Sequence, residues 1–262
     1  MLNQITPVIL TFNEAPNIGR TLERLSWAQD VVVVDSLSTD ETLAIVSRYS
    51  NARVVQCEYI SHSQKWNFAV KETGIHTEWV LALDADYIVP EDLMREIQSL
   101  TPAADVAGYR ASFKYCIEGR PLRATVYTPV IVLFRRDCAH YTQDGHTQRV
   151  KLDGMIEPLM NVIYHDDRKA LSSWVEAQNR CMRLDAEKLL NLEWKALRWP
   201  ERIRRLRIIA PFAMLFYCLF VKGLILDGRA GIFYSFQRAF AELLLSLYLL
   251  EKTIIGMQDG KK

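Results

Sequence analysis

The first 90 residues alternate short apolar runs with polar segments that favour helices. The apolar runs have the length of buried strands, and they span residues 7–11, 31–35, 52–55 and 79–83. Pro16 suits the first turn of a helix, where a missing N–H costs little, and Ser38 and Glu41 have capping-box spacing. A further helix is expected over residues 63–73. This alternation predicts an α/β fold with a parallel sheet covered on both faces.

Three of the predicted strands end in acidic or amide side chains. Asn13 and Glu14 follow the first strand, Asp35 ends the second, and Asp84 and Asp86 follow the fourth. Because the carboxyl ends of parallel strands open into one crevice, we expect these groups to converge there. If the fourth strand stays extended, Asp84 and Asp86 leave it on the same face. Such a pair suits Mg²⁺ or Mn²⁺, held by carboxylates together with the phosphate oxygens of a substrate.

Beyond residue 100 the pattern changes to longer strands. Strands are predicted over residues 105–115 and 129–135, with a turn at Gly119 and Arg120, as in a mixed sheet. A dense polar cluster follows between residues 141 and 150. It contains Gln143, Asp144, His146, Gln148 and Arg149. Its simplest structural interpretation is a polar loop that caps neighbouring strands.

Four segments resemble, in this order and spacing, the inverting family-2 glycosyltransferases of GT-A fold. They are Thr11-Phe12-Asn13-Glu14, residues 34–42, residues 65–69 and Leu83-Asp84-Ala85-Asp86. The resemblance covers roughly residues 5–170 and implies a mixed, largely parallel sheet flanked by helices. It also implies a nucleotide-diphosphate sugar donor, usually a UDP-sugar. In such enzymes the first strand end and Asp35 would hold the nucleoside, Lys65 would lie near the uracil or diphosphate, and Asp84 and Asp86 would hold ribose and metal.

The resemblance further implies a general base that takes a proton from the acceptor hydroxyl during transfer. A carboxylate suits this role, and the resemblance supports the position of Asp144. Many relatives carry adjacent acidic residues here, whereas Asp144 is followed by Gly145 and His146. His146 therefore remains an alternative base, because imidazole titrates near neutral pH. His165 stands where some relatives place a histidine near the metal or diphosphate, so it is a candidate metal ligand.

Each candidate also has a purely structural interpretation. Asn13 and Glu14 would cap the first helix, and Asp35 would be a turn residue. Lys65 would be a solvated charge on a helix, and a lone histidine is more often structural than a ligand. The shared sheet edge favours function at the first three positions, and the pairing of Lys65 with Asn67 in the family pattern favours it at the fourth.

Composition mainly excludes other classes of protein. The 262 residues suffice for one sizeable core and an appendage, and half of them are hydrophobic. The formal net charge of +1 gives no reason to expect a nucleic-acid partner. Five cysteines without a CxxC pair predict neither a disulfide framework nor a structural zinc site. The first residues show no pattern of a secretory signal, so we expect an intracellular protein.

The C-terminal region combines cations with apolar helices. Arginines dominate the segment before the first apolar run, at positions Arg198, Arg202, Arg204, Arg205 and Arg207. Apolar helices are predicted over residues 208–221 and 233–255, separated by Lys222 and a turn at Asp227 and Gly228. This combination suits an interfacial anchor on an anionic membrane leaflet. The apolar run is short for a span, so interfacial or re-entrant helices are our first interpretation. A transmembrane hairpin and a soluble helical subdomain or dimer face are the alternatives.

We therefore predict a GT-A catalytic domain over residues 1–170 and a helical region over residues 171–262. The nucleotide half of the domain would span about 1–100 and the acceptor half about 101–170. The pattern of Leu226-Asp227-Gly228 and Gly231 between apolar helices is similar to the lipopolysaccharide core β-glucosyltransferase type of bacterial enzymes.

That resemblance implies transfer of one sugar to a lipopolysaccharide-core or other lipid-linked acceptor. It further implies a peripheral protein on the cytoplasmic side of the bacterial inner membrane. One alternative is an enzyme that charges a polyprenyl phosphate. The other is an inactive, membrane-associated scaffold that binds a nucleotide sugar.

Overall fold

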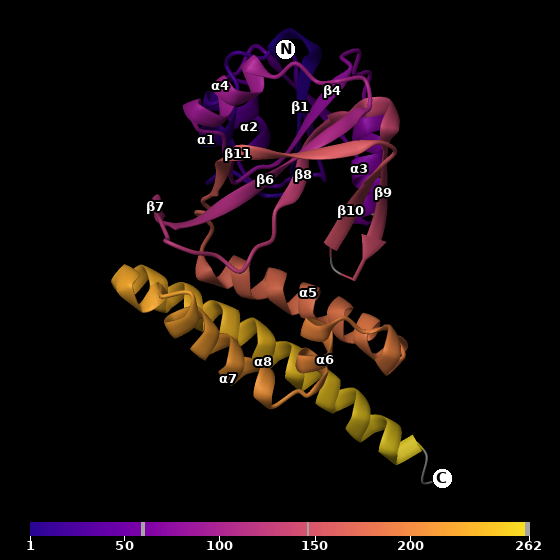
Figure 1. The fold of residues 1–262 in the computed structure, drawn as a ribbon, viewed down its shortest axis with the longest axis vertical. Helices are drawn as coiled ribbons and strands as arrows, with labels where there is room; N and C mark the ends of the chain where they lie inside the picture. Colours follow the sequence, from indigo (N-terminus) through magenta and orange to yellow (C-terminus); the bar gives the residue numbers. More distant parts are fainter. Residues whose placement is uncertain (59–60, 146, 260–262) are drawn as a thin grey trace. The chain divides into compact units, whose positions relative to one another are not determined.

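The computed structural model describes residues 1–58, 61–145 and 147–259, and the chain divides into two compact units (Figure 1). The first unit comprises Met1–Pro121 and Tyr127–Lys169. The second comprises Leu122–Val126 and Ala170–Lys262. All of the described strands belong to the first unit, and the second is built mainly from helices.

One mixed sheet of nine strands forms the centre of the first unit. The strands are β1 (Ile5–Thr11), β2 (Val31–Asp35), β3 (Ala52–Gln56), β4 (Trp79–Asp84), β5 (Tyr87–Ile88), β6 (Val106–Ile117), β7 (Arg120–Pro121), β8 (Val130–Arg135) and β11 (Met155–His165). Their order is β3-β2-β1-β4-β8-β6-β11-β5, with β7 paired to β6. Strands β3, β2, β1 and β4 pair in parallel, and so do β6 and β11. Strand β8 is antiparallel to both neighbours, which confirms the predicted mixed, largely parallel sheet.

Helices cover both faces of this sheet because successive strand residues point to opposite sides. The helices are α1 (Ile18–Glu23), α2 (Thr42–Val46), α3 (His62–Lys71) and α4 (Glu91–Ser99), with short 3-10 turns at η1 (Leu2–Gln4) and η2 (Arg136–Cys138). Ile9 and Leu81 pack in a core with residues of α1, α2 and α4. Val8 and Val80 pack in a second core on the face of α3 (Figure 1). The continuous apolar runs of β1, β2 and β4 therefore reflect burial on both faces.

The polar segment after residue 138 forms a hairpin for which we predicted no strands. It consists of β9 (Ala139–Asp144) and β10 (Thr147–Leu152) and makes a separate two-stranded antiparallel sheet. Asn67 of α3 bonds the hairpin twice, because its side chain accepts from the Tyr141 N–H and donates to the Tyr141 carbonyl, both at 2.9 Å. The rings of Trp66 and Tyr141 stack with centroids 5.3 Å apart. Helix α3 thereby fixes the hairpin within the first unit.

The second unit consists of α5 (Leu171–Asn191), α6 (Trp199–Arg205), α7 (Ile209–Phe216) and α8 (Gly228–Asp259), with the short turns η3 (Trp194–Ala196), η4 (Tyr217–Val221) and η5 (Leu224–Asp227). Met182, Leu189, Leu245 and Leu249 form its core. The predicted helix over residues 208–221 ends in the π-helical turn η4. No single described helix is long and apolar enough to cross a membrane, but Ile209–Val221 and Leu224–Ile254, bent by 69°, together meet that criterion.

The arginines of the predicted basic cluster make contacts inside the second unit. Arg204 lies between Asp185 and Glu242, at 2.9 and 3.0 Å. The other guanidinium groups bond backbone carbonyls or polar side chains: Arg198 with Glu201, Arg202 with the Leu197 carbonyl, Arg205 with the Leu192 carbonyl and Arg207 with Thr253. A guanidinium offers five donors, which suits it to joining several segments. Arg204, Arg205 and Arg207 therefore join separate segments of the unit, and Arg198 and Arg202 hold the start of α6, which their charge alone did not indicate.

Candidate active site

Asn13 fastens the loop after β1 to the loop after β2. Its backbone N–H donates to the hydroxyl of Ser38 at 2.9 Å, and its side-chain oxygen accepts from the Thr39 N–H at 2.9 Å. The backbone of Asn13 has a φ of 53°, in the left-handed region that asparagine tolerates better than most residues. The residue that caps α1 is Asn17. Asn13 thus shapes the sheet edge where the candidate residues meet.

Asp35 is fully buried at the end of β2. Its carboxylate accepts hydrogen bonds from the Thr11 hydroxyl at 2.9 Å, the Ser38 N–H at 2.8 Å and the Ser38 hydroxyl at 2.5 Å. The capping box predicted for Ser38 and Glu41 is therefore wrong, because the Ser38 hydroxyl is bound to Asp35 and α2 begins only at Thr42. Asp35 holds the loop that follows β2 against the end of β1.

Lys65 is a buried cation in this site, and its interpretation as a solvated charge is wrong. The side chain comes from α3, and its Nζ donates to the Thr11 carbonyl at 2.8 Å. Burial lowers the pKa of Lys65 to about 8, although the neighbouring carboxylates, Asp35 first, oppose that change. The amine therefore places a positive charge at the carboxyl ends of β1 and β2.

Asp84 and Asp86 stand where β4 ends. The expectation of an extended strand through both residues is wrong, because β4 stops at Asp84 and the chain turns at Ala85 and Asp86. The two carboxylates nevertheless lie close enough to interact. Burial, together with the charge of Asp86, raises the pKa of Asp84. For Asp86, burial acts in the same direction, but the nearby His165 outweighs it and lowers the pKa.

His165, at the end of β11, reaches Asp86 directly. Its Nε2 lies 3.0 Å from the Asp86 Oδ2. Three tyrosine rings surround the imidazole, with centroid distances of 5.4 Å to Tyr87, 4.8 Å to Tyr115 and 5.4 Å to Tyr127. Burial alone would lower the pKa of His165, but the Asp86 carboxylate raises it well above its usual value. His165 is therefore held against Asp86, and its role as a metal ligand stays a prediction.

The two aspartates fit a divalent cation. The Oδ1 atom of Asp86 is buried and has no hydrogen-bond partner among the described residues. Within the described part of the chain, no group of three or more His, Cys, Asp or Glu side chains is arranged to hold a metal ion. Mg²⁺ and Mn²⁺ are commonly held by one or two carboxylates plus substrate phosphates. Asp84 and Asp86 could supply that share of the ligands, with a phosphate group completing the set.

A charged segment directly after His165 closes one side of the site, and our sequence analysis missed it. Lys169 donates to Glu14 at 2.6 Å, and Arg20 bonds Asp166 at 2.7 Å. Burial raises the pKa of Glu14 to about 7, with Lys169 opposing the increase. Asn17 joins the two loops by donating to both Glu14 and Asp167. The available signal was the run Asp166-Asp167-Arg168-Lys169, whose charges follow a buried strand.

The predicted base, Asp144, ends β9 of the hairpin. Its carboxylate accepts from Arg149 Nε across the hairpin at 2.5 Å. Burial and the nearby charge of Asp84 raise the pKa of Tyr141 on β9. The hairpin therefore lies close to the two aspartates. His146, the alternative base, lies outside the described residues.

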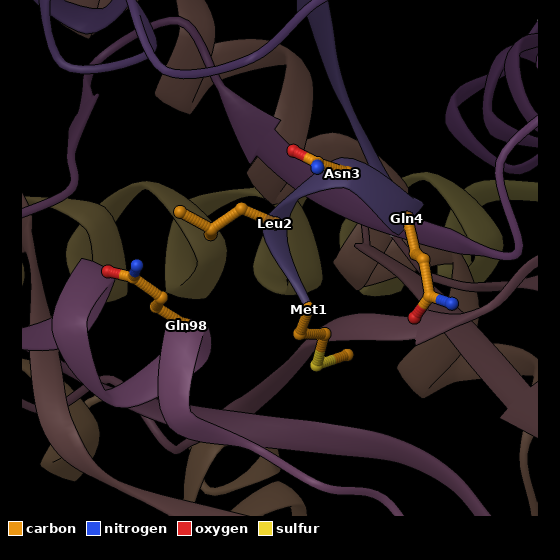
Figure 2. Close-up of a pocket in the computed structure, with 5 residues that line it drawn as sticks. All are labelled: Met1, Leu2, Asn3, Gln4 and Gln98. Carbon is orange, nitrogen blue, oxygen red and sulfur yellow. The ribbon is translucent and has the colours of Figure 1, made fainter.

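A shallow depression elsewhere on the first unit does not coincide with these residues. It is lined by Met1, Leu2, Asn3, Gln4 and Gln98 (Figure 2). The first four of these precede β1, whereas the candidate residues follow it. A strand of seven residues separates the two ends by about 20 Å. The depression is therefore unrelated to the candidate site.

Comparison with known proteins shows the family to which the chain belongs. A family model described as glycosyl transferase family 2 matches residues 6–145, more than half of the chain. A glycosyltransferase of Rickettsia bellii is 32% identical over 112 residues, covering 42% of this chain and 37% of the relative. The lipopolysaccharide core biosynthesis glycosyltransferase LpsC of Rhizobium meliloti is 28% identical over 138 residues, covering 51% and 48%. The chain thus spans less than half the length of these curated relatives.

Solved structures share the fold at low sequence identity. Glucosyl-3-phosphoglycerate synthase from Mycobacterium tuberculosis, solved with phosphoglyceric acid, aligns with a TM-score of 0.50 and 14% identity over 72% of this chain and 79% of that one. A mycobacterial protein aligns with a TM-score of 0.50 and 16% identity over 71% and 74%. At such identities the likeness concerns the fold, which agrees with the sheet order described above.

Proposed function

The chain belongs to glycosyl transferase family 2, and from this premise we propose that it moves one sugar from a nucleotide-diphosphate donor to a glycan acceptor with inversion. One observation carries the proposal. Asp35 at the end of β2, Lys65 of α3, and Asp84 and Asp86 at the end of β4 gather at the carboxyl ends of parallel strands. Ligands of open α/β sheets bind at this edge.

The donor side combines a buried cation with two carboxylates. The amine of Lys65 would offset the charge of a bound diphosphate, while the loop held by Asp35 would border the nucleoside. Asp84 and Asp86 would hold Mg²⁺ or Mn²⁺ at the diphosphate. A bound divalent cation supplies positive charge that stabilises the leaving diphosphate. Asp86 is oriented for this role by its bond to His165.

The acceptor side requires a group that removes a proton. As the acceptor oxygen bonds to the anomeric carbon, the bond from that carbon to the diphosphate oxygen breaks. Asp144 would take the proton of the acceptor hydroxyl, and a carboxylate of this kind contributes roughly a hundredfold or more to such a step. Arg149, which now holds Asp144, would have to leave it or share it with the acceptor. His146 is the alternative base.

We further propose a lipopolysaccharide-core or other lipid-linked glycan as the acceptor. The support is the 28% identity to LpsC, whose name assigns it to lipopolysaccharide core biosynthesis. A polyprenyl phosphate acceptor is the second candidate within the same chemistry. In either case the protein would work at the cytoplasmic face of a bacterial inner membrane.

Two experiments test the proposal. Calorimetric titration of the purified chain with UDP, in Mg²⁺ or Mn²⁺ and then in EDTA, should show binding that depends on the metal. Mass analysis of lipopolysaccharide from a strain lacking the gene should show a core shortened by one sugar. An unchanged core together with loss of a polyprenyl-linked sugar would favour the second candidate. Binding of UDP without any lost sugar would instead indicate an inactive scaffold.

A further inference from the structure

Helix α8 exposes apolar side chains along one face, while its opposite face buries polar as well as apolar side chains. Phe233, Phe236, Phe240, Leu243 and Leu247 are exposed, at the spacing of one helix face. The polar side chains Ser235, Gln237, Glu242 and Ser246 are buried in the second unit. A helix that borders water carries charged and polar residues on its outward face instead. The outward face of α8 is therefore suited to an apolar environment.

The segments before α8 extend this exposed apolar surface. The side chains of Phe212 and Leu226 are 71% and 70% exposed, and Phe216 and Phe220 are exposed as well. We call the exposed apolar side chains of α7, η4, η5 and α8 the apolar face. Soluble monomers rarely expose contiguous apolar patches of more than a few hundred Å². These exposed apolar side chains lie on elements that pack against one another, and they indicate a partner that is itself apolar.

Exposed charges within residues 208–250 have one sign, whereas Glu251 and Lys252, near the end of α8, are both exposed and carry opposite charges. Asp227 is ion-paired with Arg123 at 2.9 Å, and Glu242 is ion-paired with Arg204 at 3.0 Å. Between positions 208 and 250, all of which the structure describes, no carboxylate is exposed, whereas Arg229 is exposed and Lys222 partly so. Cations bordering an apolar, phenylalanine-rich surface complement an anionic lipid leaflet.

From this distribution we propose that the apolar face docks into one anionic leaflet of a bilayer, with α7 and α8 lying along the interface. Lys222 and Arg229 would then meet lipid phosphates. A second copy of the chain would present the same cations and so lacks this complementarity. A spanning arrangement of the bent helix pair would carry Lys222 into the membrane near the 69° bend, where burying its charge is unfavourable. The arginines of residues 198–207 contribute mainly to the internal contacts of the unit.

Vesicle flotation of the full chain tests this surface, using phosphatidylcholine vesicles with and without phosphatidylglycerol. The double variant Phe212→Gln/Leu226→Gln should weaken binding at least tenfold, because the exposed apolar area is lost. The double variant Lys222→Gln/Arg229→Gln should weaken it about fivefold per cation, on anionic vesicles at low salt only. Met160→Gln, which changes an 85% exposed side chain of the first unit, should bind like wild type.

Three results would overturn the proposal. The first is a wild type that stays unbound to anionic vesicles at low salt. The second is a stable dimer in solution that Phe212→Gln/Leu226→Gln converts to monomer, because that identifies a self-association surface. The third is retention on membranes through carbonate extraction, because that indicates deep insertion. Circular dichroism confirms that each variant is folded. Vesicle binding needs no donor or acceptor, so its failure leaves the proposed transferase activity standing.

Discussion

Nε2 of His165 lies 3.0 Å from Oδ2 of Asp86, although 79 positions separate the two residues in the chain. The contact joins the last residue of β11 to the turn after β4. It leaves the second oxygen of Asp86 buried without a hydrogen bond from any described residue. One oxygen of Asp86 is therefore held in place, while the other keeps its lone pairs available for a cation.

Asp86→Asn should abolish metal-dependent UDP binding and sugar transfer while the fold persists. The amide retains an oxygen for His165 but loses the negative charge that a divalent cation requires. Calorimetry in Mg²⁺ and in EDTA measures the effect. Asp92→Asn removes a carboxylate from an exposed ion pair with Arg95 and serves as the control. Undiminished transfer by Asp86→Asn in EDTA would refute the metal assignment.

Asp144→Asn should retain donor binding and lose acceptor transfer by roughly a hundredfold or more, since the general base is removed. Steady-state transfer assays at saturating donor, combined with UDP titrations, separate the two effects. His146→Ala is the paired variant. If that variant alone loses activity while Asp144→Asn remains nearly normal, the imidazole is the base.

The raised pKa of Glu14 predicts that the difference in stability between the wild type and Glu14→Gln depends on pH. Its pKa is about 7 in the folded chain and near 4.5 when unfolded, so the folded state retains the proton more tightly. The resulting stabilisation is complete below pH 4.5 and is lost as the pH rises to 7. Relative to Glu14→Gln, the wild type should therefore lose up to about 3 kcal/mol across that window. Parallel denaturant titrations at several pH values measure the difference.

Glu91 is exposed, so the variant Glu91→Gln is the control. Its free energy of unfolding should equal that of the wild type at every pH. If the wild type instead gains stability relative to Glu14→Gln as the pH rises, the ion pair with Lys169 outweighs burial.

Arg204→Met should destabilise the second unit by about 3–5 kcal/mol, because two buried carboxylates, Asp185 and Glu242, lose their common counter-ion. Thermal unfolding followed by circular dichroism measures the loss. Arg95→Met breaks an exposed pair in the first unit and should cost about 1 kcal/mol or less. Comparable losses in the two variants would argue against a buried network.

The strands β1, β2 and β4 were predictable because burial on both faces requires an unbroken run of apolar residues. Their acidic ends were equally visible, since each carboxylate directly follows such a run. The hairpin of β9 and β10 gave no such signal. Gln143, Gln148 and Arg149 lie in its strands. Because these residues are polar, the sequence pattern favoured a loop. Its stability depends on contacts with α3, which no local pattern reveals.

Long-range pairing explains the other differences between prediction and structure. In the sequence, Lys65 cannot be distinguished from a solvent-exposed lysine on a helix. In the structure, its amine donates to the carbonyl of Thr11, which is distant in the chain. The arginines of α6 resemble a membrane-binding cluster, yet Arg204 finds two carboxylates on other helices. In each case the partner is distant in sequence, so local spacing indicates the residue but not its role.

Residues 122–126 belong to the helical unit although they lie between β7 and β8 along the chain. Leu122 is buried, Arg123 pairs with Asp227, and the Thr125 hydroxyl lies 3.3 Å from that of Tyr234. During translation this segment leaves the ribosome about a hundred codons ahead of those partners. A nascent chain that stops after Lys169 would therefore hold Arg123 without Asp227 and Thr125 without Tyr234, and both contacts can form only after synthesis has passed residue 234.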